Sequence, residues 1–503
     1  MAVSQQVLLV NPTITSHRHA RFPLAVMSLS AALEGKYSST IIDGNVDRRY
    51  IATTLSAIND RSVAAVGITV MGGPQLCSAI EVSKAIRRSR PTLPIVWGGA
   101  FPTVCPEAAL NTAYVDYAVR AQGEETFLEL LDALAEQRCD GVEAIAGLSW
   151  RQRSEIVHNK DRKFSSASLN RMLPYDKLEN PRQYLTNTYL GRRTMGYQAA
   201  LGCRFRCTFC GVATMFQGKM SLPPAERLQQ DLSYMQERLG VDAIQFYDHN
   251  FFDREVDMVP LLEVLAKFQM PWWCFARSDA LVNLSEKSWA LVKKSRLRMA
   301  YIGAESPSDW LLHDIRKGTN KDQTLEAVEK CRSHGVVPEL SFMLAPPQDP
   351  EGETEKTFEF IRLIKRLHPA TEVMIYIYTP LPRRHDKNPA SLRMANELRD
   401  CNGAAVVFPR SADEWAEPQW VDYWCHQSAP WLSERLRRRI VDFTTVLGCR
   451  YPTIMDIRAS AWGKSALRAL AAWRYRFQRY DDPWELRVSR KIIRHWDPRV
   501  MSL

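Results

Sequence analysis

Two long stretches of the chain alternate short apolar runs with segments of helical periodicity, and this alternation constrains the fold more than any other feature. In the first stretch the apolar runs predict five strands, at Val7–Val10, Ser39–Ile42, Val63–Val70, Ile95–Trp97 and Asp116–Val119. Helical patterns occupy segments between and after these runs, for example Ala25–Leu33 and Ser78–Arg88. Strands that alternate with helices form parallel sheets covered by helices. We therefore predict an α/β fold whose first domain, residues 1–140, is doubly wound and Rossmann-like.

A second series of the same kind spans residues 191–385, after an irregular, polar segment at 141–190 that we expect to be a linker. Its six predicted strands are Gly196–Leu201, Ala243–Tyr247, Trp272–Ala276, Met299–Ile302, Val337–Leu344 and Val373–Tyr378. Six strands with intervening helices predict a partial or complete (β/α) barrel, with its chemistry at the carboxyl ends of the strands. Residues 386–503 lack the alternation, contain eight of the 14 tryptophans, and are predicted to be helical.

Composition and segment patterns exclude several classes of protein. Of the 503 residues, 46% are hydrophobic and 24% charged, which is typical of folded chains and not of disordered ones. The longest stretch without charge, Ser62–Ile80, contains Gly72-Gly73-Pro74 and so predicts a strand, a loop and a helix start, not a membrane span. Met1–Pro12 lacks the pattern of a secretory signal, which predicts a cytoplasmic protein with reduced cysteines.

Three of the eleven cysteines form a compact motif directly after a predicted strand. Cys203, Cys207 and Cys210 have the spacing C-x3-C-x2-C. Three thiolates on one loop can hold three irons of a [4Fe-4S] cluster and leave the fourth iron open for chemistry. A structural zinc ion normally has four protein ligands, so this spacing favours the cluster.

From this motif onward the chain resembles the radical S-adenosylmethionine (SAM) superfamily. The resemblance extends to Ile244–Asp253, Cys274–Asp279, Ile302–Ser306, Lys317-Gly318 and Met343–Thr354. It implies that the open iron binds SAM and that the reduced cluster cleaves SAM to a 5′-deoxyadenosyl radical. It also implies that Phe209 contacts the adenine, that Asp248 lies near the SAM amino group, and that Glu305 lies near the ribose hydroxyls.

The resemblance leaves alternatives open for three charged residues. Asp248 and Glu305 can instead form ion pairs or helix caps, and Arg277 either binds a carboxylate or neutralises Asp279. The superfamily often has Gly-Gly-Glu near its second strand, whereas this chain has Tyr247-Asp-His-Asn250 there.

The first domain resembles the cobalamin-binding domain that precedes many radical SAM enzymes. The matching segments are Asn11-Pro12, Phe22–Leu24, Val66–Thr69, Trp97–Thr103 and Gly123–Thr126. The resemblance implies that Thr69, Gly98, Gly99 and Gly123 contact cobalamin. No Asp-x-His-x-x-Gly occurs, and His17 and His19 are expected to be exposed loop residues, so we expect cobalt without a histidine ligand. The loop from Thr69 to Gln75 would then line the lower face, while a degenerate domain without the cofactor is the alternative.

The last domain combines arginines with apolar residues at helical spacing, in Arg435–Arg439 and Leu467–Tyr480. Such helices can lie on a membrane surface or face an acidic ligand. The alternative is a bundle that packs its tryptophans against the barrel. By resemblance, residues 386–503 would close the active site over the substrate.

Together these features predict a cobalamin-dependent radical SAM methyltransferase that acts on an unactivated carbon. The expected partners are a small-molecule substrate, for which a large apolar molecule is compatible, and an electron donor such as a flavodoxin or ferredoxin. Peripheral membrane contact is compatible with the basic helices, and no nucleic acid is expected. No catalytic residue is singled out. The alternatives are a cyclase without net methyl transfer, and a non-catalytic sensor or electron carrier. A methylthiotransferase is disfavoured because Cys77, Cys105 and Cys139 are too widely spaced for a second cluster.

Overall fold

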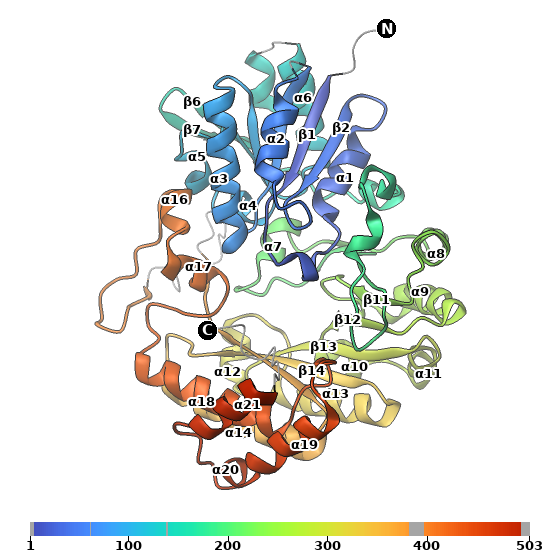
Figure 1. Cartoon of the computed structure of the whole chain (residues 1–503), viewed down its shortest axis with the longest axis vertical. Coiled ribbons are helices and arrows are strands. Elements are labelled where there is room, and N and C mark those ends of the chain that lie inside the picture. The colour runs from blue at the N-terminus through green and yellow to red at the C-terminus, as the bar shows by residue number, and fades with distance from the viewer. Residues whose placement is uncertain (1–4, 61, 137–138, 382–396, 494–503) are drawn as a thin grey trace.

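The protein is elongated, with three parts that follow one another along its long axis (Figure 1). The structure is a computed structural model that describes residues 5–60, 62–136, 139–381 and 397–493. The first domain lies at one end, the second sheet with its helices lies in the middle, and the last helices lie at the other end. The two large sheets are therefore separate, and each belongs to one of the first two parts.

The first domain is built on a seven-stranded sheet. The first five strands are parallel and have the order β2-β1-β3-β4-β5, namely β1 (Gln6–Asn11), β2 (Ser38–Asp43), β3 (Val63–Thr69), β4 (Ile95–Gly98) and β5 (Tyr117–Val119). Its helices are α1 (Leu24–Leu33), α2 (Tyr50–Ile58), α3 (Pro74–Ser89), α4 (Ala100–Val104), α5 (Pro106–Leu110) and α6 (Glu124–Ala135). All five predicted strands are present, and the predicted doubly wound fold class is confirmed.

Alternate residues of β1 pack on opposite faces of this sheet. Val7 and Leu9 join the apolar core under α1 and α6, whereas Leu8 and Val10 join the core that includes residues of α3. Side chains of a strand point alternately to its two faces, so a strand covered on both faces must be apolar throughout. This explains why the run from Val7 to Val10 has no polar residue.

The sheet continues past residue 140 into the segment expected to be a linker. Strands β6 (Leu148–Gln152) and β7 (Glu155–His158) add to β5 as an antiparallel hairpin. They are short and exposed at one end, so their apolar pattern is too weak to stand out in the sequence. Three single helical turns follow, and Phe22 of the first domain stacks on Tyr184 at a centroid distance of 4.8 Å. The linking segment is therefore pinned to the first domain.

The middle part is an open, six-stranded parallel barrel. Its order is β15-β14-β13-β12-β11-β8, so β8 and β15 are the two edges. The strands are β8 (Thr194–Tyr197), β11 (Ala243–Phe246), β12 (Trp272–Ala276), β13 (Leu297–Glu305), β14 (Val337–Leu344) and β15 (Glu372–Ile377). Its main helices are α8 (Ala225–Tyr234), α9 (Glu255–Phe268), α11 (Glu286–Lys294), α13 (Lys321–His334) and α14 (Pro350–Leu367). All six predicted strands exist, although the first ends at Tyr197 instead of Leu201.

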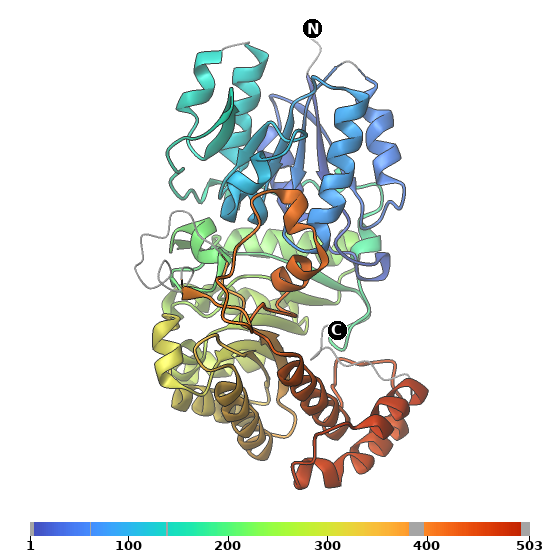
Figure 2. The same cartoon turned by 90° about the vertical axis from the view of Figure 1, so that its left-hand side faces the viewer.

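The C-terminal region divides into two parts that contact different domains (Figure 2). Helices α16 (Ala412–Trp415) and α17 (Pro418–Trp424) lie beside the first domain, where Lys84 forms an ion pair of 2.6 Å with Asp413. Helices α18 (Glu434–Arg450), α19 (Ala461–Leu470), α20 (Ala472–Arg476) and α21 (Trp484–Ile493) lie at the far end. There Phe443 of α18 stacks on Phe358 of α14 at 3.7 Å between centroids. Within the described residues, no helix is both long and apolar enough to span a bilayer.

Candidate active site between the two domains

The three motif cysteines lie on one loop at the carboxyl end of the edge strand β8. This loop runs from the short strand β9 (Leu201–Gly202) to helix α7 (Gly211–Phe216). Cys207 is buried and Cys203 and Cys210 are half-buried, while the backbone N–H of Cys210 donates to the carbonyl of Cys207 at 3.2 Å. Burial, together with the neighbouring Cys210 and Cys207, raises the pKa of the Cys203 thiol to about 11. The three thiols are therefore within electrostatic reach of one another.

Their chemistry fits a cluster with one open iron, because three sulfur donors come from one loop. Among the described residues, no three cysteine, histidine, aspartate or glutamate side chains already converge as a metal-binding group. The loop thus provides the donors, and their side chains must turn toward a common centre when a cluster binds.

A second segment holds the cysteine loop from the side. The backbone N–H of Thr208 donates to the carbonyl of Ile315 at 2.9 Å, which ties the loop to the segment before Lys317. The ammonium group of Lys317 lies 5.8 Å from the centroid of the Phe209 ring. The guanidinium of Arg277 lies 3.5 Å from the centroid of Phe205 and donates to the Lys317 carbonyl at 2.7 Å. Two cations therefore flank a loop that would carry thiolates.

Arg277 forms the ion pair that was one of its two alternatives. Its guanidinium pairs with the Asp279 carboxylate through both oxygens, at 2.9 and 3.0 Å. In this structure Arg277 therefore neutralises Asp279 and supports the Phe205 ring.

Glu305 ends β13 in an unusual backbone conformation. Its φ is +62°, a left-handed value that non-glycine residues rarely adopt, and the register of β13 on β14 shifts between Gly303 and Glu305. Its carboxylate accepts from Lys317 Nζ at 2.6 Å, and both side chains are more than nine-tenths buried. A Cβ at Gly303 would overlap the Glu305 carboxylate and crowd Lys317, so this site needs a glycine. The structure thus places Glu305 in an ion pair at the barrel mouth, and its contact with the SAM ribose stays a prediction.

Lys317 remains charged in this buried position. Burial lowers the pKa of its ammonium group, but Glu305 and Cys207 raise that pKa, and the net result lies above the ordinary value. The Glu305–Lys317 pair is therefore a charged pair next to the cysteine loop.

Asp248 lies at the end of β11 and is fully buried. Its carboxylate accepts from the backbone N–H of Ala199 at 3.2 Å and from that of Ala200. Burial raises the pKa of Asp248 to about 7, although the two amides lower it. Asp248 therefore holds the backbone that leads into the cysteine loop, and its contact with the SAM amino group stays a prediction.

The four residues expected to contact cobalamin lie at or just after the carboxyl ends of strands of the first sheet. Thr69 at the end of β3 is the register partner of Gly98 at the end of β4, and Gly123 precedes α6. Gly99 has φ +99°, and a Cβ there would lie 3.0 Å from the Val70 carbonyl. Because the glycines have no side chains, a flat ring system can approach the backbone closely here. The carboxyl ends of these strands therefore fit a corrin.

The loop from Thr69 to Gln75 is held by Gln75 and Asn11, and by Trp424, which the sequence did not indicate. Gln75 donates to Asn11 Oδ1 at 2.9 Å and accepts from the Met71 N–H at 2.8 Å. Trp424 of α17 covers Gly72 so closely that a Cβ there would overlap its indole ring. The double glycine Gly72-Gly73 was the available signal for this close approach, but nothing in the sequence identified the side chain that uses it.

The carboxyl ends of the strands of the two sheets face each other across the domain boundary. Helix α4, which follows Gly99, contacts helix α7, which follows Cys210. Arg21 of the first domain lies over the ring of Tyr247 of the barrel, 5.0 Å from its centroid. His17 and His19 precede Arg21 in a short turn with no buried residue, as expected for loop histidines.

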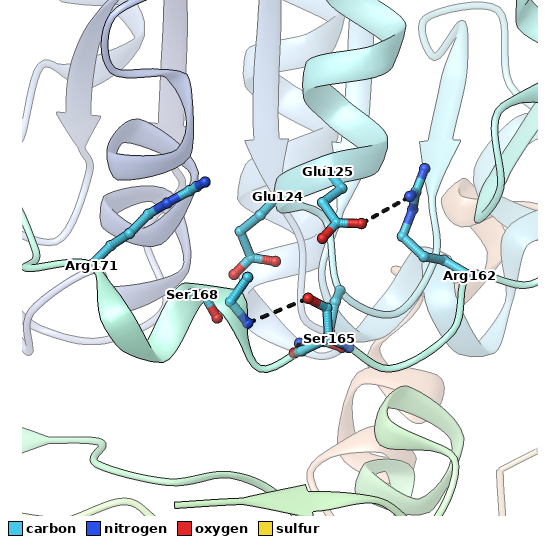
Figure 3. A pocket seen from close by; sticks show the side chains of 8 residues that line it. Glu124, Glu125, Arg162, Ser165, Ser168 and Arg171 are labelled. Carbon is cyan, nitrogen blue, oxygen red and sulfur yellow. Dashed lines mark hydrogen bonds and ion pairs between the residues drawn. The ribbon is translucent and has the colours of Figure 1, made fainter. Parts of the chain in front are cut away.

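Two pockets lie along the segment that joins the domains. One is lined by Ser28 of α1, Arg171 and Leu173 of the joining segment, and Gln198 and Leu201 of the barrel, among others. Figure 3 shows the other, where Glu124 and Glu125 at the start of α6 point toward the segment that carries Ser165 and Ser168. Arg162 closes its side through a 3.0 Å ion pair with Glu125. The second pocket borders the loop that contains Gly123, because Gln122 and Glu124 line it.

Comparison with known families agrees with this division of the chain. The B12 binding domain matches residues 14–131, and the radical SAM superfamily matches residues 197–361. The chain joins a B12-binding domain to a radical SAM domain. These matches confirm the combination predicted from the sequence, together with the cobalamin and SAM that give the two families their names.

Several curated proteins are similar over most of the chain. An uncharacterized methyltransferase of Pyrococcus horikoshii is 26% identical over 345 residues, which cover 68% of this chain and 73% of that protein. Cytidylyl-2-hydroxyethylphosphonate methyltransferase of Streptomyces wedmorensis is 22% identical, with the same two coverages. The anaerobic magnesium-protoporphyrin IX monomethyl ester cyclase of Synechocystis is 21% identical and covers 59% of this chain and 58% of its own.

Two solved structures share the fold of this B12-binding radical SAM protein. The radical SAM methyltransferase TsrM of Kitasatospora setae, with cobalamin and a [4Fe-4S] cluster bound, has a TM-score of 0.61 at 17% identity and covers 94% of this chain and 99% of its own. The cobalamin-dependent radical SAM enzyme OxsB, with aqua-cobalamin and SAM bound, has a TM-score of 0.63 at 16% identity, with coverages of 94% and 71%. The likeness therefore includes both domains and most of the C-terminal region.

Proposed function

We propose that the protein is a cobalamin-dependent radical SAM methyltransferase that methylates an unactivated carbon of a small molecule. The contact between α4 and α7 carries this proposal, because it brings the loop expected to hold cobalamin next to the loop expected to hold the cluster. Methyl transfer to a carbon radical needs both cofactors at one cavity. The methyltransferases among the relatives, and the cofactors bound in TsrM and OxsB, support the same function.

The roles of the side chains follow from their positions. Cys203, Cys207 and Cys210 would hold the cluster, and SAM would bind the open iron near Phe209 and Glu305. When bound, the cluster and SAM supply a carbon-centred radical that abstracts hydrogen, and cobalamin supplies a methyl group. Lys317 and Arg277 place positive charge beside the anionic thiolates. Thr69, Gly98, Gly99 and Gly123 would present backbone to the corrin.

A cyclase without net methyl transfer is the second candidate, and the similarity to the magnesium-protoporphyrin cyclase favours it. Both reactions need the same cofactors, so the arrangement of the two loops supports either. The electron donor, such as a flavodoxin or ferredoxin, is part of both proposals. The substrate would enter at the boundary between the domains, where the pocket lined by Ser28 and Gln198 lies.

One experiment separates these functions. The full chain is reconstituted without oxygen with iron, sulfide and cobalamin, reduced, and incubated with SAM that carries a deuterated methyl group. We expect 5′-deoxyadenosine and a deuterated methyl group on the bound cobalamin. Formation of 5′-deoxyadenosine without label on cobalamin would favour the cyclase. An intact, reduced cluster that yields neither product would favour a sensor or electron carrier.

A further inference from the structure

The last three helices leave an unusual number of large apolar side chains in contact with solvent. These are Trp462, Leu470, Trp473, Phe477, Trp484, Val488 and Ile492, which we call the C-terminal aromatic face. Trp462 and Ile492 are 78% and 76% exposed. Soluble surfaces seldom gather so many large apolar residues, and such a patch marks an interaction site.

The exposed residues form two helical stripes that meet. Trp462 and Leu470 lie eight residues apart on α19, Trp473 and Phe477 lie four apart on α20 and its C-cap, and positions 484, 488 and 492 recur every four along α21. Residues at these spacings share one face of a helix. A Cβ at Gly463 would lie 2.5 Å from Ile493 Cγ2, so the start of α19 touches the end of α21. The two stripes are therefore neighbours.

The opposite faces of the same helices are packed. Leu467, Ala471, Tyr475 and Leu486 are buried and belong to the large apolar core. Arg474 pairs with Glu485, which joins α20 to α21. Each of these helices therefore also buries at least one apolar side chain: Leu467 in α19, Tyr475 in α20 and Leu486 in α21.

The charge around this face is strongly positive. Residues 461–493 contain eight lysines and arginines and three acidic residues. All three acids are paired: Glu485 with Arg474, Asp482 with Arg487, and Asp481 with Arg439. Four exposed cations in the same helices and their connections form no ion pair with the described residues: Arg468, Arg476, Arg479 and Lys491. Their charge is available to an anionic partner.

We propose that the C-terminal aromatic face docks the protein on an anionic membrane surface. Tryptophan and phenylalanine insert at the level of lipid headgroups, and neighbouring arginines attract anionic lipids. A second copy of the chain is a poor occupant, because a two-fold contact would set the same positive surfaces against each other. Since the face lies at the end of the molecule away from the first domain, docking leaves the boundary between the domains uncovered (Figures 1 and 2).

Vesicle flotation with the full holoprotein tests the proposal. We expect binding to vesicles of phosphatidylcholine mixed with phosphatidylglycerol, weak binding to phosphatidylcholine alone, and a decrease when salt rises from about 0.05 M to about 0.5 M. The variant W462S/F477S should bind the mixed vesicles about tenfold more weakly, since it removes two inserted side chains. The control V256S changes a residue of α9 that is 75% exposed and should bind as the parent does.

A second variant keeps the test decisive if the first does not fold. R476Q/R479Q leaves every apolar contact in place, so it should keep its thermal midpoint and lose the preference for anionic vesicles. Equal binding of all variants, or no binding of the parent, would overturn the proposal. A dimer that W462S/F477S abolishes in gel filtration would also overturn it, and would assign the face to a second copy. Retention of the parent by an acidic polymer but not by vesicles would assign the face to an acidic macromolecule.

Discussion

The ammonium group of Lys317 lies 2.6 Å from the carboxylate of Glu305, and the pair is buried beside the cysteine loop. Both residues lie in segments that resemble the radical SAM superfamily, but the sequence predicted a role for Glu305 only. Lys317→Met should lower the free energy of unfolding by about 3–5 kcal/mol, because it leaves a buried carboxylate without a counter-charge. Urea unfolding of the apoprotein measures this.

The double variant E305Q/K317M should recover much of that loss, since neither charge then remains alone. Arg438→Met is the control, because Arg438 and Glu434 pair at 3.1 Å with 75% and 63% of their side chains exposed, and its removal should cost at most about 1 kcal/mol. Equal losses for K317M and R438M would contradict the importance of burial at the Glu305–Lys317 pair.

The three motif cysteines should be individually required for iron. Alanine at Cys203, Cys207 or Cys210 should reduce bound iron and the cluster absorbance severalfold after anaerobic reconstitution, because each supplies one of three ligands. Cys331→Ala changes a buried cysteine of α13 outside the loop, and it should retain the parent's iron content. Full iron content in any of the three loop variants would show that its thiol is not a ligand.

Gly72→Ala should weaken the attachment of α17 to the first domain, because the new methyl group would overlap the indole of Trp424. Overpacking of this kind costs about 1–3 kcal/mol, which thermal or urea unfolding can detect. In a protein that already carries Trp424→Ala, Gly72→Ala should lower the free energy of unfolding much less, because the indole that the new methyl group would overlap is absent. Gly211→Ala is the control, since a Cβ there meets nothing within 4 Å.

Asp248 should make the stability of the apoprotein depend on pH. Its pKa is about 7 in the folded protein against an ordinary value of 3.8, so between these values the folded state binds more protons than the unfolded state. The contribution of this group is fully present below pH 4 and is lost as pH rises through 7, with a slope of at most about 1.4 kcal/mol per pH unit. Asp248→Asn should flatten that fall when unfolding is measured from pH 4 to pH 7. Parallel curves for the parent and the variant would contradict the raised pKa.

Local patterns were enough to predict most of the fold. The strands were visible because buried parallel strands are apolar throughout, as Val7–Val10 and Ile95–Trp97 are. The cysteine loop was visible because its ligands are close in sequence. The hairpin of β6 and β7 was missed because short, half-exposed strands have weak patterns, and the segment was expected to be a linker.

Long-range contacts of the site were not predictable in the same way. Trp424 packs on Gly72, although about 350 residues of chain separate them. Asp248 accepts hydrogen bonds from the backbone N–H groups of Ala199 and Ala200, and nothing in the sequence indicates that these two residues would make them. Such pairs depend on the tertiary structure, which periodicity and spacing do not encode.

The contacts of Asp413 with the first domain restrict how the first domain and the barrel can separate. Asp413 accepts from both Lys84 and Tyr114, while the segment that leaves the first domain is pinned independently by the stacking of Tyr184 on Phe22. The polypeptide therefore bridges the two domains at two separate places. Separation of the two domains must therefore either rotate them about the line that joins these two attachments or break one of the attachments.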